Sequence, residues 1–141
     1  MKFWFRFYQE EGWWLACCPD LDRITQGHDY EEAAKMAGDL LVCMLGDTWG
    51  EGQDIAVSES HPDEPGEWRL VGVPIRPYVA MLIRRERKRR HLTMQQVADK
   101  LGIKLGTYQR FEDVLKSNLT LGSLERIFKV LGQEISFRLA S

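Results

Sequence analysis

The sequence changes the sign of its charge near the midpoint, and this change constrains the fold more than any single motif does. Residues 1–73 contain five Lys or Arg and fifteen Asp or Glu, a net charge of −10. Residues 74–141 contain fourteen Lys or Arg and six Asp or Glu, a net charge of +8. A chain of 141 residues is long enough for two small domains, and their opposite charges predict that they bind different partners.

The acidic half has the residue alternation of an antiparallel sheet. The run KFWFRFY places its three phenylalanines on one face, and WWLACC and RITQG follow as further strands separated by turn residues. Asp29 stands at the N-cap of a helix whose small and apolar residues recur with helical spacing as far as Leu45. An acidic loop rich in Gly and Pro occupies residues 46–66, and EWRLVGVPI follows it as a last strand. We therefore expect an α+β domain over residues 1–75 with the order β-β-β-α-β.

The basic half has the spacing of short helices. Pro77 suits a first helical turn, and Thr93 with Gln96 forms the pattern of a capping box, which opens a helix that ends at Gly102. Two further helices are expected in KLGTYQRFEDVL and TLGSLERIFKVLG. The apolar residues expected to be buried on these two helices are Tyr108, Phe111, Leu115, Leu121, Leu124, Ile127, Phe128 and Leu131.

The end of the chain alternates once more. Residues 133–140 are predicted to form a terminal strand with Ile135, Phe137 and Leu139 on one face. An apolar strand left alone at a chain end is a pairing edge, so these three residues are candidate dimerisation residues. The strand could equally pair within its own subunit. Residues 76–141 thus predict an all-α domain followed by a strand.

Two short helices joined by a tight turn with a glycine are typical of a helix-turn-helix motif. LTMQQVADKLGIKLGTYQRFE, continuing through SLERIFKVLG, resembles the Cro/lambda-repressor type over residues 78–132. The resemblance implies that the second helix enters the major groove of operator double-stranded DNA, with two-fold symmetric operators and dimeric protein. Thr107 and Gln109 are expected to reach bases, and Lys104 and Arg110 phosphates. The complete set of candidate DNA-binding residues is Gln95, Gln96, Lys104, Leu105, Thr107, Gln109 and Arg110.

The motif departs from its type at two places. Met94 stands where such repressors often have a phosphate-contacting glutamine, and Leu105 with Gly106 replaces polar residues at base-reading positions. We therefore expect few direct base contacts and more dependence on DNA shape. The nearby run RRERKRR, residues 84–90, is compatible with a solvated helix end and with phosphate contacts.

The stretch LACCPDLDRITQGHDYEEA concentrates groups that can carry chemistry, but their spacing does not favour catalysis. Cys17 and Cys18 are adjacent in a strand, so they point to opposite faces and suit neither a disulfide nor joint ligation of zinc. Asp20 and Asp22 fall at a turn and Asp29 at a helix cap, which is a poor arrangement for a two-metal nuclease. We expect no catalytic residue, no metal site and no cofactor.

The same stretch, taken with the aromatic hairpin before it and the long helix after it, resembles the N-terminal domain of HicB-family antitoxins. FWFRFYQEEGWWLACCPDLDRITQGHDYEEAAKMAGDLL carries the likeness, over residues 2 to about 45. The resemblance implies a partial RNase H-like fold that has lost its catalytic carboxylates. It also implies a partner, a HicA-like toxin protein that is small and basic and cleaves mRNA. The charge of −10 suits such a partner on electrostatic grounds.

The leading hypothesis is therefore an antitoxin, not an enzyme, that inhibits its toxin through the first domain and represses its own operon as a homodimer or higher homo-oligomer. Exposed aromatic anchors with an acidic rim would bind the toxin. The candidate toxin-binding residues are Trp4, Trp13, Trp14, Asp20, Asp22, Glu31 and Glu32.

Two alternatives remain open: a regulator whose first domain senses a small molecule, and an RNase H-like nuclease. The sequence has no apolar run long enough to cross a membrane and no secretion signal at its start, so we expect a cytoplasmic protein.

Overall fold

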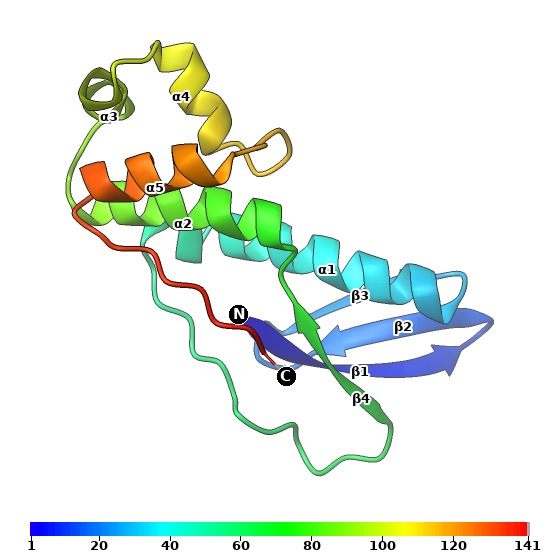
Figure 1. The fold of residues 1–141 in the computed structure, drawn as a ribbon. Coiled ribbons are helices and arrows are strands. Elements are labelled where there is room, and N and C mark those ends of the chain that lie inside the picture. Colours follow the sequence, from blue (N-terminus) through cyan, green and yellow to red (C-terminus); the bar gives the residue numbers. More distant parts are fainter. Residues whose placement is uncertain (141) are drawn as a thin grey trace. The chain divides into compact units, whose positions relative to one another are not determined.

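The structure is a computed structural model that describes residues 1–140, and it contains two compact units (Figure 1). The first unit comprises Met1–Thr48 and Asp54–Ile75. The second comprises Trp49–Gln53 and the chain from Arg76 onward. Five residues of the acidic half therefore belong to the unit that the basic half forms.

The first unit is a four-stranded antiparallel sheet covered on one face by a helix (Figure 1). The strands lie in the order β3-β2-β1-β4. The chain order is β-β-β-α-β, as the alternation in the sequence predicts. The elements are β1 (Lys2–Glu10), β2 (Trp13–Cys18), β3 (Arg23–Gly27), α1 (Tyr30–Gly46) and β4 (Glu67–Gly72).

The core of the first unit lies between the sheet and α1. The three phenylalanines of β1 are at most 2% exposed, and the buried residues of α1 are Ala33, Ala37, Leu41 and Leu45. Small residues in the first half of α1 allow the helix to approach the sheet closely, and Gly27 at the end of β3 makes the approach closer still. A Cβ at Gly27 would lie 2.4 Å from the backbone nitrogen of Ala33, so no larger residue fits without movement.

The second unit is a cluster of four short helices. They are α2 (Ile75–Arg89), α3 (Met94–Leu101), α4 (Leu105–Phe111) and α5 (Leu121–Val130). One core joins them, and its buried members are Ile83, Val97, Ala98, Leu101, Tyr108, Leu124, Ile127, Phe128 and Leu131. The mixed α+β class with a helical second half is as predicted.

Two apolar residues that helical spacing assigns to this core are exposed instead. Helix α4 ends at Phe111, so Leu115 lies in the following turn and is 87% exposed. Leu121 is the first residue of α5 and is 73% exposed. The periodic pattern therefore extends past the end of α4, and it also counts the exposed first residue of α5 as buried.

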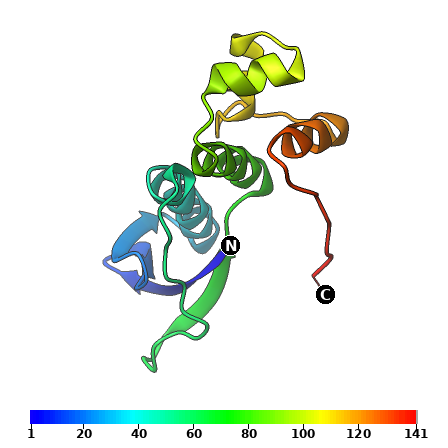
Figure 2. The ribbon, with the colours of Figure 1, turned by 90° about the vertical axis from the view of Figure 1, so that its left-hand side faces the viewer.

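The predicted terminal strand is also absent from the structure of the single chain. Residues 133–140 form no helix and no strand ladder, and they run away from α5 as an extended segment (Figures 1 and 2). Ile135 packs at the edge of the helical core, whereas Phe137 is 73% exposed and Leu139 96% exposed. A strand needs a neighbour for its hydrogen bonds, and residues 1–140 provide none here.

The long loop has local structure at its beginning. A single 3-10 turn, η1 (Trp49–Glu51), follows α1, and the remaining loop residues up to β4 form neither helix nor strand.

Candidate nucleic-acid interface

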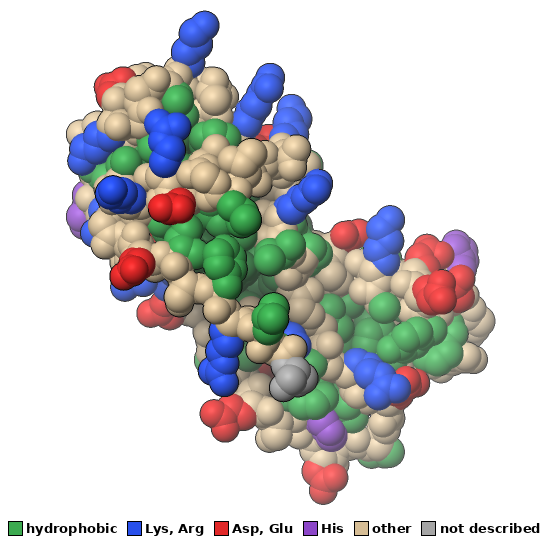
Figure 3. Space-filling model, in the orientation of Figure 1, with side chains coloured by type: hydrophobic (Ala, Val, Ile, Leu, Met, Phe, Trp, Pro, Cys, Tyr) green, Lys and Arg blue, Asp and Glu red, His purple; other side chains and the backbone are tan. Residues whose placement is uncertain are grey.

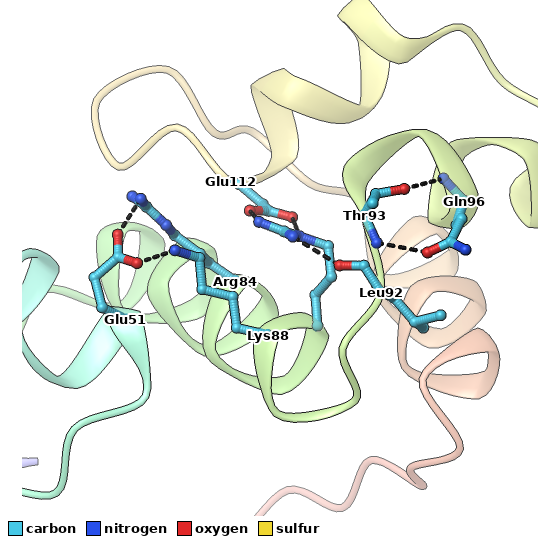
Figure 4. A network of polar contacts seen from close by, with 8 residues as sticks. Glu51, Arg84, Lys88, Leu92, Thr93, Gln96 and Glu112 are labelled. Atoms are coloured by element: carbon cyan, nitrogen blue, oxygen red, sulfur yellow. Dashed lines mark hydrogen bonds and ion pairs between the residues drawn. The ribbon is translucent and has the colours of Figure 1, made fainter.

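Helices α3 and α4 form a helix-turn-helix whose first helix is capped at both ends. The Thr93 hydroxyl accepts a hydrogen bond from the Gln96 nitrogen at 3.1 Å, and the Thr93 nitrogen donates to the Gln96 side-chain oxygen at 2.8 Å (Figure 4). At the other end Gly102 adopts the left-handed conformation, with φ of 69°. Only residues 102–104 separate the two helices, so the turn is tight and its geometry is set by the glycine.

The inner side of the motif is mainly apolar. Ala98 is buried where α3 meets α4, and Tyr108 anchors α4 from beneath with none of its surface exposed. Because these positions fix the buried side of α4, its other side faces solvent.

The predicted DNA-binding residues lie on this outer side. Lys104, Thr107, Gln109 and Arg110 are exposed, and Leu105 is half-buried. Gly106 is also exposed, with no atom within 4 Å of the place where a Cβ would lie. Figure 3 shows Lys and Arg side chains gathered around α3 and α4.

The two glutamines of α3 are exposed but already engaged. Gln95 donates to Asp99 at 2.8 Å, and the side-chain oxygen of Gln96 completes the capping box. Gln96 therefore has its amide nitrogen to offer a phosphate, while Gln95 would have to exchange its partner.

A buried ion pair holds the end of α4 against α2. The Arg87 guanidinium donates to both Glu112 carboxylate oxygens, at 2.7 Å and 3.0 Å, and to the Leu92 carbonyl at 2.9 Å (Figure 4). Arg87 is 7% and Glu112 6% exposed. The buried Tyr108 hydroxyl lies nearby, and burial raises the pKa of this phenol, with the Glu112 carboxylate adding to the effect. The pair therefore fixes the orientation of α4 from the inside.

The basic run at residues 84–90 is less exposed than a solvated helix end would be, and it is also less available for phosphate contacts than its sequence predicts. Arg85 and Arg87 are buried, at 6% and 7% exposed. Arg84 and Lys88 both pair with Glu51 (Figure 4). The exposed cations of the run are those at its end, Arg89 and Arg90.

The segment Trp49–Gln53, which we call the clasp, binds Arg84, Arg85 and Lys88 of the basic run. Trp49 stacks on Tyr78 with ring centroids 5.5 Å apart and planes 15° apart. The Arg85 guanidinium lies 4.8 Å from the centroid of the Trp49 ring and donates to the carbonyls of Trp49 and Gln53, both at 2.8 Å.

The hydrogen bond from Lys88 lowers the pKa of the Glu51 carboxyl below its ordinary value of 4.5, and the charge of Arg84 lowers it further. Sequence reasoning missed the clasp, because its partners lie 29 or more positions away along the chain.

In the first unit the predicted toxin-binding tryptophans fall on both faces of the sheet. Trp14 packs near α1, where its ring meets Tyr30 with centroids 5.4 Å apart. Trp4 and Trp13 alternate with buried core residues of their strands, so they lie on the face that α1 leaves open. All three are half-buried.

The predicted acidic residues are also divided. Asp20 accepts two hydrogen bonds from Ser58, and Asp22 is exposed at a turn with φ of 51°. Glu31 and Glu32 occupy the first turn of α1, where Asp29 caps the helix by accepting from the Glu32 nitrogen at 2.8 Å. The candidate acids therefore do not form one cluster.

The adjacent cysteines point to opposite faces, as predicted for a strand. Cys18 is buried on the side of α1, and Cys17 is half-buried on the open face. Burial raises the pKa of both thiols. Within residues 1–140 no three His, Cys, Asp or Glu side chains are grouped closely enough to hold a metal ion, and no helix is long and apolar enough to span a membrane.

Comparison with known proteins supports the assignment of the second unit. Residues 83–137 match the model of a helix-turn-helix family, and no curated protein matches the chain. The match covers α3, α4 and α5, including the exposed side of α4 described above. The chain therefore contains a DNA-binding helix-turn-helix domain of the Cro/C1 type, which is typical of transcription regulators.

Proposed function

We propose that the protein is an antitoxin of the HicA/HicB type, which represses its own operon and inhibits a small basic toxin that cleaves mRNA. The observation that carries the proposal is the union of two units of opposite charge, of which the basic one presents an exposed recognition helix. In this proposal the protein has no catalytic activity of its own and acts as a homodimer or higher homo-oligomer on a symmetric operator.

The DNA-binding part of the proposal assigns separate roles to the residues of α4. Thr107 and Gln109 read base edges, Leu105 contacts a thymine methyl group, and Lys104 and Arg110 hold phosphates. The exposure of four of these side chains, together with the buried anchors beneath them, supports this division.

The DNA-binding part is tested by titrating the protein onto its own promoter at several salt concentrations. Lys104→Ala should weaken binding to all sequences and reduce the salt slope by about one. Gln109→Ala should instead weaken operator binding by about 1–3 kcal/mol and leave non-specific binding unchanged. Equal effects of both variants on operator and random DNA would contradict the assignment of base readout to α4.

The antitoxin part is tested by co-expression with the small open reading frame next to the gene. Rescue of growth and co-purification of the two proteins would support it. If the neighbouring product is not toxic, or is toxic and not bound, the antitoxin assignment fails and the DNA-binding regulator remains.

One observation favours a second candidate, a regulator whose first unit senses a small molecule. The first unit has a pocket of about 260 Å³ lined by Trp4, Pro19, Asp20, Ser58, Ser60, His61 and Pro62. This volume lies just below the range of about 300–1,000 Å³ that is usual for small-molecule sites. A metabolite that changes operator affinity, with no toxic neighbour, would favour this candidate over the antitoxin.

The nuclease alternative finds less support in the arrangement of carboxylates. Asp20 is bonded to Ser58, Asp29 caps α1, and Asp39 lies along that helix. Purified protein should therefore show no Mg²⁺-dependent cleavage of RNA. Cleavage that disappears in Asp20→Asn and Asp22→Asn would overturn this part of the proposal.

A further inference from the structure

The sheet face opposite α1 carries exposed apolar side chains. Strand pairing aligns Trp4 with Leu70 and Cys17 with Ile24 on this face. Ile24 is 54% and Leu70 49% exposed, whereas every phenylalanine on the covered face is at most 2% exposed. A sheet with one apolar face left partly uncovered is a candidate binding surface.

The acidic loop is tied across one side of this face by specific contacts. Asp20 accepts hydrogen bonds from the Ser58 nitrogen at 2.8 Å and from the Ser58 hydroxyl at 2.6 Å. The Trp4 indole donates to the Glu59 carbonyl at 3.2 Å, and the Trp68 indole donates to the Glu64 carbonyl at 3.0 Å. The loop backbone is therefore held in place at several points along its length.

These ties produce a small pocket with aromatic walls and a carboxylate. His61 stacks on Trp68 with ring centroids 4.7 Å apart and planes 5° apart, and it meets Trp4 edge-on at 4.9 Å. Trp4, His61 and Asp20 line the pocket of about 260 Å³ described above. Each carboxylate oxygen of Asp20 has used one acceptor site on Ser58, so one further site remains on each oxygen.

We propose that this pocket receives a cationic side chain, arginine above all, from the basic protein that the first unit binds. The inference rests on the proposed function and identifies the pocket of the first unit that would bind the toxin. An indole face attracts a guanidinium, and a carboxylate beside it can accept both of its parallel hydrogen bonds. The chain's own Arg6 illustrates the first interaction on the same face, where its guanidinium lies 4.7 Å from the centroid of the Tyr8 ring.

Charge selects a basic protein over a second copy of this unit. The first unit holds five Lys or Arg and fourteen Asp or Glu, so two copies meeting through this face would repel each other. Glu59 lies exposed on the loop that borders the pocket, so a basic protein would meet its charge at the rim. The Glu64 carboxylate is paired with Arg6 at 3.8 Å.

The test measures the affinity of the full-length chain for the product of the neighbouring small open reading frame. Asp20→Asn and His61→Ala should each weaken binding at least about tenfold, as loss of a central anchor does. Asp39→Asn removes the same charge from an exposed position on α1 and should change affinity by no more than about twofold. Operator binding and the circular dichroism spectrum should be unchanged in all three variants, which excludes misfolding.

The outcomes separate this inference from the function on which it rests. Absence of binding by the unaltered chain would reject the antitoxin, and the inference with it. Binding that survives both pocket variants would reject the pocket and leave the antitoxin intact. Two other results would reject a basic protein as the occupant. Quenching of tryptophan fluorescence by free L-arginine at micromolar concentration would indicate a small-molecule site, and dissociation of a homodimer by Asp20→Asn would indicate a second copy of the chain.

Discussion

A single carboxylate, that of Glu112, determines whether the charged interior of the helical unit is tolerated. The Arg87 guanidinium is almost fully removed from water, and Glu112 and the Leu92 carbonyl accept its hydrogen bonds. Burial of an ion is costly unless its partners are present. The unit is therefore much less stable when one member of the pair is removed than when both are present.

Removal of the carboxylate should therefore be severe. We expect Glu112→Ala to lower the free energy of unfolding by about 3–5 kcal/mol, because it leaves a buried guanidinium without its partner. Tyr108→Phe is the matched control: the Tyr108 hydroxyl is buried without a hydrogen bond of good geometry, so its removal should cost less than about 1 kcal/mol. Urea unfolding of the full chain measures both. A larger loss in Tyr108→Phe than in Glu112→Ala would contradict the role given to the pair.

The three thiols should differ in reactivity according to their surroundings. Cys43 is exposed on α1, Cys17 is half-buried, and Cys18 is fully buried. Burial also raises the pKa of Cys17 and Cys18, so at neutral pH less of each is the reactive thiolate. Iodoacetamide followed by mass spectrometry should label Cys43 first and Cys18 last, and raising the pH should speed the labelling of Cys17. Early labelling of Cys18 would show that α1 leaves the sheet readily.

At the scale of elements, short-range signals in the sequence predicted more than long-range ones. The caps at Asp29 and Thr93 depend on residues within three positions, and both are present. Leu115 was wrongly assigned to the core, because a periodic pattern does not record where a helix ends. The clasp was not predicted at all: Arg85 meets Trp49 across thirty-six positions, and no local pattern indicates such a contact.

The clasp makes an acidic residue part of the basic unit, and its contribution should depend on pH. The folded-state pKa of Glu51 lies below the ordinary value of 4.5. The stabilising effect is therefore complete above that ordinary value and is lost as the pH falls through the lowered folded-state pKa.

Replacement of Glu51 should reproduce this loss at neutral pH. Glu51→Gln should destabilise the chain by about 0.5–1 kcal/mol at neutral pH, and the difference from the unaltered chain should disappear in strong acid. Hydrogen exchange would locate the effect in α2. Glu59→Gln, in the same loop and exposed, is the control and should leave α2 unchanged. A difference that persists in acid would mean that the carboxylate charge is not what Arg84 and Lys88 require.

At the scale of the whole molecule, the sequence predicted the division into an α+β part and a helical part, because charge and hydrophobic period change together near residue 75. It did not predict that Trp49–Gln53 would join the helical part. That segment is acidic and lies inside a loop, so composition assigns it to the wrong unit.

The exposed end of the chain gives the last prediction, which concerns assembly. Phe137 and Leu139 are 73% and 96% exposed on an extended segment without a strand partner, and a second copy could supply both the ladder and the apolar contact. Phe137→Asp with Leu139→Asp should therefore shift the chain toward monomer in sedimentation experiments and weaken operator binding most at low protein concentration, since dimers bind symmetric operators. Ser136→Asp adds one charge to the alternate face of the same segment and should leave the dimer largely intact. If all variants sediment as the unaltered chain does, the tail is not a surface through which copies associate, and the proposed dimer would need a different contact.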